Sequence, residues 1–121
     1  MRLLALTRAP VELATATKGA INMISRHWRG LAKSTHADEY VEHLRTETFP
    51  QLSNIPGFVN ASILKRKVQE GVEFLIVTNW ESIKAIEQFS GREPEIAVVP
   101  EKAQKMMIEY DHKVRHYEVV T

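Results

Sequence analysis

The stretch GVEFLIVTNWESIKAIEQFSG, residues 71–91, decides the fold, because it reads as one strand that runs directly into one amphipathic helix. Within residues 72–77 apolar side chains occupy both alternating positions, so neither face of this strand is typical of a solvent-exposed surface. Helices of the same chain can cover one face. A chain of 121 residues has little left for the other face, so we infer a second copy of the protein there.

The composition is that of a single globular domain. Lysine and arginine number 16 against 15 acidic residues, and the net charge of +1 provides no general field for nucleic acid or an anionic membrane. The chain has no cysteine, which excludes disulfides, thiolate nucleophiles and thiolate-bound metals. No segment approaches an apolar membrane span. We therefore expect a cytoplasmic protein with neither nucleic-acid nor membrane partners.

Residues 1–22 differ from the rest of the chain. They are rich in alanine and threonine and contain a single acidic residue, Glu12. We interpret them as a flexible arm or an upstream start, because Met23 lies where the first strand begins. Their arginine and threonine content also resembles an organellar presequence. The folded domain is expected to span residues 23–121.

The hydrophobic periodicity predicts seven elements in this domain. Ser34 or Thr35 is expected to cap the first helix, Pro50 to kink or end it, and Ser82 and Gly91 to bound the second helix. Residues 92–99 read as a loop. The elements are a strand at 24–31, a helix after 35, a hairpin of strands at 58–67 and from 72, a helix at 83–90, a short helix at 101–109 and a strand at 113–120.

This order predicts an α+β fold, a ferredoxin-like sandwich with a four-stranded antiparallel sheet. Helices would cover one face of the sheet, and a small, mostly apolar pocket would lie between the two layers. The other face would pair with a second copy to form a dimeric α/β barrel.

Short motifs spread over residues 23–120 carry a family resemblance. They are Trp28-Arg29-Gly30, Tyr40-Val41-Glu42-His43-Leu44, Ile55-Pro56-Gly57-Phe58, the run from Phe74 to Ser82, Phe89-Ser90-Gly91, Ala97-Val98-Val99-Pro100 and His116-Tyr117-Glu118-Val119. This set resembles the antibiotic biosynthesis monooxygenase family, whose members are dimeric α/β barrels. The resemblance implies a homodimer. The family includes cofactor-free oxygenases of aromatic polyketides, haem-degrading oxygenases, isomerases and proteins of unknown activity, so its implication for function is broad.

Haem degradation is the less favoured of these activities. The haem-degrading branch has an asparagine on the first strand, a tryptophan at the end of the third and a histidine on the later helix. Trp80 corresponds to that tryptophan. The first strand offers Ser25, Arg26 and His27 instead of asparagine, and residues 93–109 contain no histidine that could be an axial ligand.

Cofactor-free oxygenation needs a base and hydrogen-bond donors in a dry pocket. His116 is the first candidate base, with His27 next, because imidazole titrates near neutral pH. Trp80 and Trp28 can donate an indole N–H to substrate, and Asn60 and Tyr40 can bind its oxygen atoms. Each of these six residues can instead be an ordinary core or interface side chain. His116, Trp80 and His27 are thus the predicted catalytic residues, and Asn60, Trp28 and Tyr40 are the predicted substrate-binding residues.

The sequence predicts no metal or cofactor site. His112 and His116 are about 13 Å apart if both lie on a strand, and His36 and His43 about 10 Å apart on a helix, so neither pair can share an ion. No HExxH motif and no glycine-rich phosphate loop is present. The basic run at residues 65–67 is typical of a solvated hairpin tip.

The favoured function is therefore a cofactor-independent monooxygenase acting on a small aromatic or enolisable compound. Two alternatives remain. One is a non-catalytic dimer that sequesters a small hydrophobic or aromatic molecule, for example under stress, and the other is an isomerase of the same fold.

Overall fold

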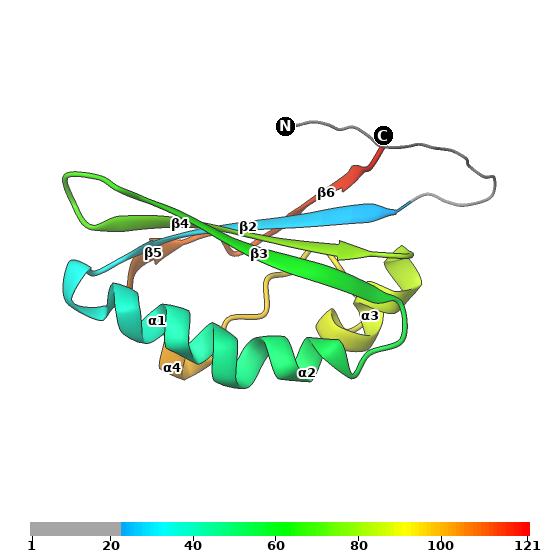
Figure 1. Ribbon diagram of the computed structural model, residues 1–121, viewed down its shortest axis with the longest axis horizontal. Helices are drawn as coiled ribbons and strands as arrows, with labels where there is room; N and C mark the ends of the chain where they lie inside the picture. The colour runs from blue at the N-terminus through cyan, green and yellow to red at the C-terminus, as the bar shows by residue number, and fades with distance from the viewer. Residues whose placement is uncertain (1–22) are drawn as a thin grey trace, which may run out of the picture.

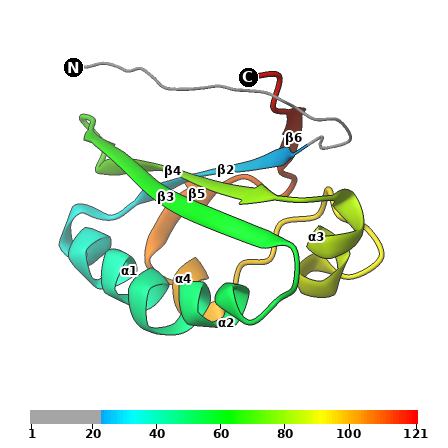
Figure 2. The ribbon, with the colours of Figure 1, turned by 45° about the vertical axis from the view of Figure 1, so that its right-hand side comes forward.

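The computed structural model describes residues 23–121, and the arm expected at residues 1–22 lies outside them. A single antiparallel sheet forms one layer, and the helices gather against one of its faces (Figures 1 and 2). The predicted α+β sandwich is confirmed, and the sheet of the single chain is open. None of the described helices is long and apolar enough to cross a membrane.

The sheet is organised around strand β2 (Ile24–Ala32), which has partners along both edges. On one side it pairs with β4 (Val72–Trp80) over its whole length. β3 (Phe58–Lys67) pairs with β4 as the predicted hairpin and completes the order β3-β4-β2-β5. β2 is therefore a central strand, and its side chains are placed on both faces of the sheet.

Two short strands share the other edge of β2. β5 (Met107–Tyr110) pairs with residues 30–32, and β6 (Arg115–Glu118) pairs with residues 24–27. Both run antiparallel to β2, one after the other. The sheet thus has five strands, where the sequence predicted four.

The prediction of a short helix over residues 101–109 is wrong for its second half. Helix α4 covers only Glu101–Gln104, and β5 begins at Met107. The edge of β2 presents backbone N–H and C=O groups that need partners, and pairing with β5 satisfies them. This non-local pairing outweighs the local helical pattern.

One long irregular helix packs under the sheet. It consists of the 3₁₀ turn η3 (Ser34–His36), α1 (Ala37–His43), the π-helical turn η4 (Leu44–Thr48) and α2 (Phe49–Ser53). In the π turn the backbone N–H of Phe49 donates to the carbonyl of Leu44, five residues earlier. Pro50 lacks an N–H and lies at the start of α2, so the wide turn accommodates it without ending the helix.

The prediction that Ser34 or Thr35 caps this helix is wrong. Neither Ser34 nor Thr35 makes a capping hydrogen bond, because the chain enters the helix through η3. The hydroxyl of Thr35 instead lies 3.0 Å from Nδ1 of His36.

The caps of helix α3 (Ile83–Ser90) are confirmed. The Ser82 hydroxyl accepts a hydrogen bond of 3.1 Å from the backbone N–H of Ala85. Gly91 ends the helix with a φ of 87°, a left-handed conformation that favours glycine.

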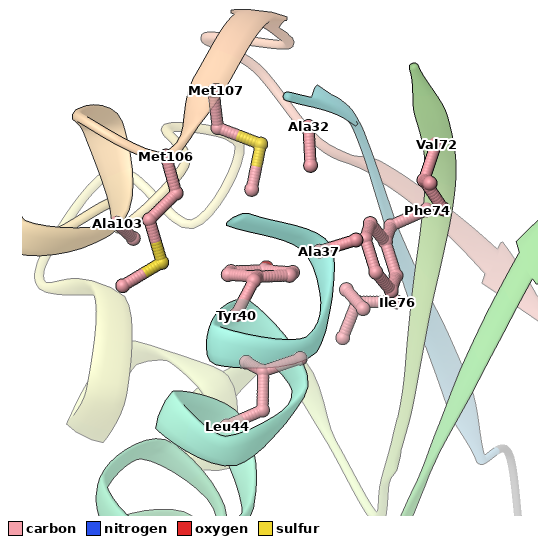
Figure 3. Packing of buried hydrophobic residues seen from close by; sticks show 10 residues of the cluster. All are labelled: Ala32, Ala37, Tyr40, Leu44, Val72, Phe74, Ile76, Ala103, Met106 and Met107. Carbon is pink, nitrogen blue, oxygen red and sulfur yellow. The ribbon is translucent and has the colours of Figure 1, made fainter. Parts of the chain in front are cut away.

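The core lies between the sheet and the helices. Every second residue of β4 is buried, and Figure 3 shows the Tyr40 ring of α1 with Phe74 on one side, Met106 on the other and Met107 above. The Tyr40 and Phe74 ring centroids are 5.0 Å apart, in an edge-on arrangement that favours aromatic pairs. A second cluster, built on Trp80, fills the other end of the layer under α3.

None of the described helices covers the opposite sheet face (Figure 1). The cross-strand register places Leu64 and Leu75 side by side on this open face, with Val77 next along β4. Leu64 is 49% exposed, whereas Leu75 and Val77 are half-buried. At one end of the face, Glu73 pairs with arginines of both neighbouring strands.

The side chain of Trp28 explains why residue 30 is a glycine. Both residues face the helices, and the indole of Trp28 fills the space beside Gly30. A Cβ atom at position 30 would lie 2.8 Å from Cζ3 of Trp28 and closer still to its Cη2, with Met107 Sδ at 3.0 Å. Only glycine leaves room for this ring, which accounts for the Trp-Arg-Gly motif.

Replacing Gly30 with alanine should therefore overpack this position and lower the free energy of unfolding by about 1–3 kcal/mol. Urea denaturation of the purified protein measures the loss. In a Trp28→Ala background the new methyl group meets no indole, so Gly30→Ala should cost much less there. Equal costs in both backgrounds would contradict this explanation.

Candidate functional site

A cavity of about 70 Å³ lies between the sheet and the helices, where the sequence predicted a pocket. Its walls are mostly apolar: Trp28, Tyr40, Leu44, Phe49, Ile76 and Phe89. An apolar cavity of about 150 Å³ holds benzene. The cavity therefore accepts a small chemical group as it stands, and the loop residues Val98 and Val99 form part of its wall.

Arg26 brings a positive charge to the cavity wall. The residue is only 5% exposed. Its Nη1 donates to the carbonyl of Pro94, its Nη2 donates to the carbonyl of Ile96 at 3.1 Å, and its Cζ lies 5.9 Å from the centroid of the Phe89 ring. Burial lowers the pKa of Arg26 to about 10, so the side chain remains charged at neutral pH. Within residues 23–121 no carboxylate forms an ion pair with it.

His116 engages this guanidinium from β6. Its Nε2 lies 3.1 Å from Nη1 of Arg26. Because a guanidinium can only donate, Nε2 must be the acceptor, and the proton of the neutral imidazole is on Nδ1. Burial and then the charge of Arg26 lower the pKa of His116, and Glu95 opposes this shift. His116 acts on the cavity through Arg26 and does not itself line it.

Trp80 likewise reaches the cavity through a neighbour. It is fully buried, and its indole N–H donates to the hydroxyl oxygen of Thr78 at 2.9 Å. Thr78 lines the cavity, and its own O–H proton is left for another acceptor. Trp80 therefore orients a hydroxyl group of the cavity wall.

His43 of α1 lines the cavity from the helix side and is 5% exposed. Its Nε2 lies 3.4 Å from the hydroxyl of Thr48, another cavity residue. Its Nδ1 is buried without a hydrogen-bond partner among the described residues, 3.6 Å from the carboxylate of Glu47. Glu47 is held by Lys102 at 2.5 Å. The carboxylate favours the proton on Nδ1, which leaves the Nε2 lone pair on the side of Thr48.

The π turn creates the contact between His43 and Thr48. These residues are five apart, a spacing that a regular α-helix does not bring to one face but a π turn does. The same turn accommodates Pro50. A backbone irregularity and two polar side chains of the cavity thus have one origin.

The other predicted site residues lie in two places. Trp28 and Tyr40 line the cavity, although the Trp28 indole N–H already donates to the carbonyl of Asp111 at 2.9 Å. His27 and Asn60 lie on the open face of the sheet. His27 Nε2 is 2.9 Å from the hydroxyl of Ser25, and the Asn60 amide oxygen accepts from Asn79 at 2.8 Å.

Sequence reasoning did not select Arg26, His43, Thr48 or Thr78 as site residues. Two of these carried a signal. Arg26 is a charge on the same strand face as Trp28, and His43 is three residues after Tyr40 on the apolar side of its helix. Thr48 carried none, because its position depends on the π turn.

No group of three or more potential metal ligands lies together within residues 23–121.

Lowering the pH should destabilise the fold through His116. The folded state depresses the pKa of this histidine, so its contribution to stability is present above the ordinary value of about 6.5 and is lost as the pH falls below it. The midpoint temperature of thermal unfolding should fall more steeply between pH 7.5 and 5 for the wild type than for His116→Gln. The glutamine keeps an acceptor for Arg26. His27, whose pKa is also lowered by burial, leaves a residual slope.

His112→Gln is the matched control, because it removes an exposed histidine that does not contact Arg26. It should leave the slope of the wild type unchanged. An unchanged slope in His116→Gln would instead remove His116 as the source.

Comparison with solved structures extends the likeness to known proteins. A Bacillus cereus protein that bears the name antibiotic biosynthesis monooxygenase is 22% identical, with 83% of this chain and 95% of that chain covered and a TM-score of 0.58. A dimeric ferredoxin-like protein from an uncultured marine organism is 13% identical over 83% and 89% of the two chains, with a TM-score of 0.55. A haem-degrading protein of Mycobacterium tuberculosis is 19% identical over 82% and 93%, with a TM-score of 0.51. At these identities the likeness concerns the fold alone.

A comparison with curated proteins gave no match. The family model for antibiotic biosynthesis monooxygenase matches residues 23–106, which covers β2 through α4 and most of the cavity wall. The chain therefore belongs to the antibiotic biosynthesis monooxygenase family.

Proposed function

We propose that this protein is a cofactor-independent monooxygenase that oxidises a small aromatic or enolisable compound in the cavity. The observation that carries the proposal is the presence of a buried imidazole, His43, and a buried guanidinium, Arg26, on the wall of one mostly apolar cavity. Removing a proton from a weak carbon acid requires a base and a positive charge near the developing anion, both shielded from water. Membership of the family supports the same activity.

The proposed reaction converts a methylene group and dioxygen into a carbonyl group and water. His43 Nε2 removes one proton from the methylene group, which is activated by a neighbouring carbonyl or aromatic ring. The resulting carbanion transfers one electron to dioxygen, and the radical pair combines to form a carbon–oxygen bond. His43 returns its proton to the peroxide. The second methylene hydrogen then leaves as a proton while the O–O bond breaks, and the departing hydroxide becomes water.

The remaining groups have supporting roles in this proposal. Arg26 stabilises the substrate oxygen on which the negative charge develops, and Glu47 orients His43. The structure leads us to move the base from His116, the candidate favoured by the sequence, to His43. His116 does not line the cavity, and its Nε2 lone pair is engaged by the charged Arg26 at 3.1 Å, so we assign His116 the positioning of that guanidinium.

We further propose that the functional unit is a homodimer formed through the open faces of two sheets. Leu64, Leu75 and Val77 give this face an apolar centre that none of the described helices covers. The dimeric ferredoxin-like neighbour supports self-association. His27 and Asn60 would then lie at the interface and not in the cavity.

The oxygenase proposal predicts oxygen uptake by the purified, metal-free protein with some member of a panel of anthrones, hydroquinones and other enolisable aromatics. His43→Gln should lower kcat by about 10²- to 10⁴-fold, the usual contribution of a general base. An oxygen electrode measures the rate. Glu42→Gln, on an exposed position of the same helix, is the matched control and should keep the wild-type rate.

The two histidines are separated by the same assay. His116→Gln should affect the rate less than His43→Gln, because glutamine still accepts a hydrogen bond from Arg26. The reverse order would return the role of base to His116. Oxygen uptake that survives both substitutions would exclude both of these histidines as the base.

The homodimer predicts that Leu64→Glu weakens self-association, because it places a charge in the centre of the buried face. Size-exclusion chromatography with light scattering should show a dimer for the wild type and a monomer for the variant at micromolar concentration. Ile96→Glu, at a comparably exposed apolar residue on the helix side, should remain dimeric. A monomeric wild type would contradict the proposal.

A further inference from the structure

The guanidinium of Arg26 has more donors than the described chain satisfies. An arginine side chain carries five N–H donors and no acceptor. Three bonds account for both hydrogens of Nη1, which reach Pro94 and His116, and for one of Nη2, which reaches Ile96. The two donors left within residues 23–121 are one on Nε and one on Nη2. Free guanidinium donors of this kind bind the oxygen atoms of anions.

The charge of Arg26 is also left uncompensated. Its three partners are two carbonyl oxygens and a neutral imidazole, and no carboxylate of residues 23–121 pairs with it. Tying a loop to a strand requires donors but no charge. A cation buried to this degree is costly without an opposite charge, which favours a counter-ion from outside the described chain.

A second donor lies beside this charge. Arg26 and Thr78 are direct partners in the β2–β4 register, so both side chains point to the same side of the sheet, and both line the cavity. The Thr78 hydroxyl accepts from Trp80 at 2.9 Å, which directs its own proton elsewhere. Two fixed donor groups and one positive charge thus converge on the strand side of the cavity, opposite His43 on the helix side.

We infer that the cavity recognises its ligand by a negatively charged oxygen, either of a carboxylate or of an enolate or phenolate, which Arg26 and Thr78 bind. This deepens the proposed function, on whose cavity it rests, by restricting the substrate to organic anions. The cavity volume of about 70 Å³ holds the anionic group with a few further atoms. His43 then faces the part of the ligand that lies away from the anion.

Binding of matched pairs of small molecules to the full-length wild-type protein tests the inference. Acetate and acetamide fit the cavity as it stands, and benzoate and benzamide are a larger pair of equal shape. 4-Nitrophenolate against nitrobenzene covers the phenolate case. Titrations followed by NMR should show each anion that fits binding roughly ten- to a hundredfold more tightly than its neutral partner, the usual gain of a charge-assisted bond. Preference for the carboxylates or for nitrophenolate identifies the source of the charge.

Substitutions of Arg26 test whether this residue causes the preference for anions. Arg26→Gln should abolish it, and Arg26→Lys, which keeps a charge but loses the fork, should reduce it. Circular dichroism checks that each variant is folded, and should both fail to fold, the comparison of neutral and anionic ligands on the wild type still decides. Lys65→Gln, in the exposed basic hairpin run, is the matched control and should change nothing. Added salt should weaken cavity binding much less than surface binding.

Equal affinity for anionic and neutral partners would overturn the inference, as would a preference that survives Arg26→Gln or disappears in Lys65→Gln. Failure of the proposed oxygenase is a different result. His43→Gln removes turnover in that proposal but leaves Arg26 and Thr78 in place, so it should retain anion binding. A protein that prefers anions and consumes no oxygen would keep this inference and lose the proposed reaction.

Discussion

The burial of the Arg26 guanidinium connects the parts of this fold that are distant in sequence. From the central strand β2 it reaches two carbonyls of the loop after α3 and the imidazole of His116 on β6. β6 and β5 leave between them the short segment at residues 111–114, and its Val114 N–H and His112 carbonyl hold the same loop. The wall of the cavity is therefore fixed to the sheet through one charged side chain, and loss of any of these three hydrogen bonds would make its burial more costly.

The helix side of the cavity depends on a backbone feature in the same way. Pro50 cannot donate a backbone hydrogen bond, and the preceding turn widens from α to π. The widening brings Thr48 next to His43 and leaves the imidazole between a hydroxyl and the carboxylate of Glu47. A regular helix would have turned Thr48 away from the cavity. The position of one proline thus determines which polar groups face the cavity.

The sequence predicts best what is decided locally. The β3–β4 hairpin and the Ser82 and Gly91 caps depend on residues close together in the chain, and all were found. β5 was read as helix because its partner, the end of β2, is about 75 residues away, and such pairing has no local signature. The site shows the same division. His43 and Arg26 lie at positions that helical and strand periodicity assign to the buried side, whereas Thr48 depends on a turn that periodicity does not describe.

The size of the cavity has a consequence for how it is filled. Its volume, about 70 Å³, is roughly half that of a cavity known to hold benzene, and part of its wall is the loop that Arg26 holds. Displacement of this loop by a ring would strain bonds from the guanidinium that would contact the ligand. Admission of a large ligand and the hydrogen bonding of Arg26 are therefore linked. An anion that takes up donors of Arg26 compensates for loop bonds that are lost, whereas a neutral ligand of equal size does not.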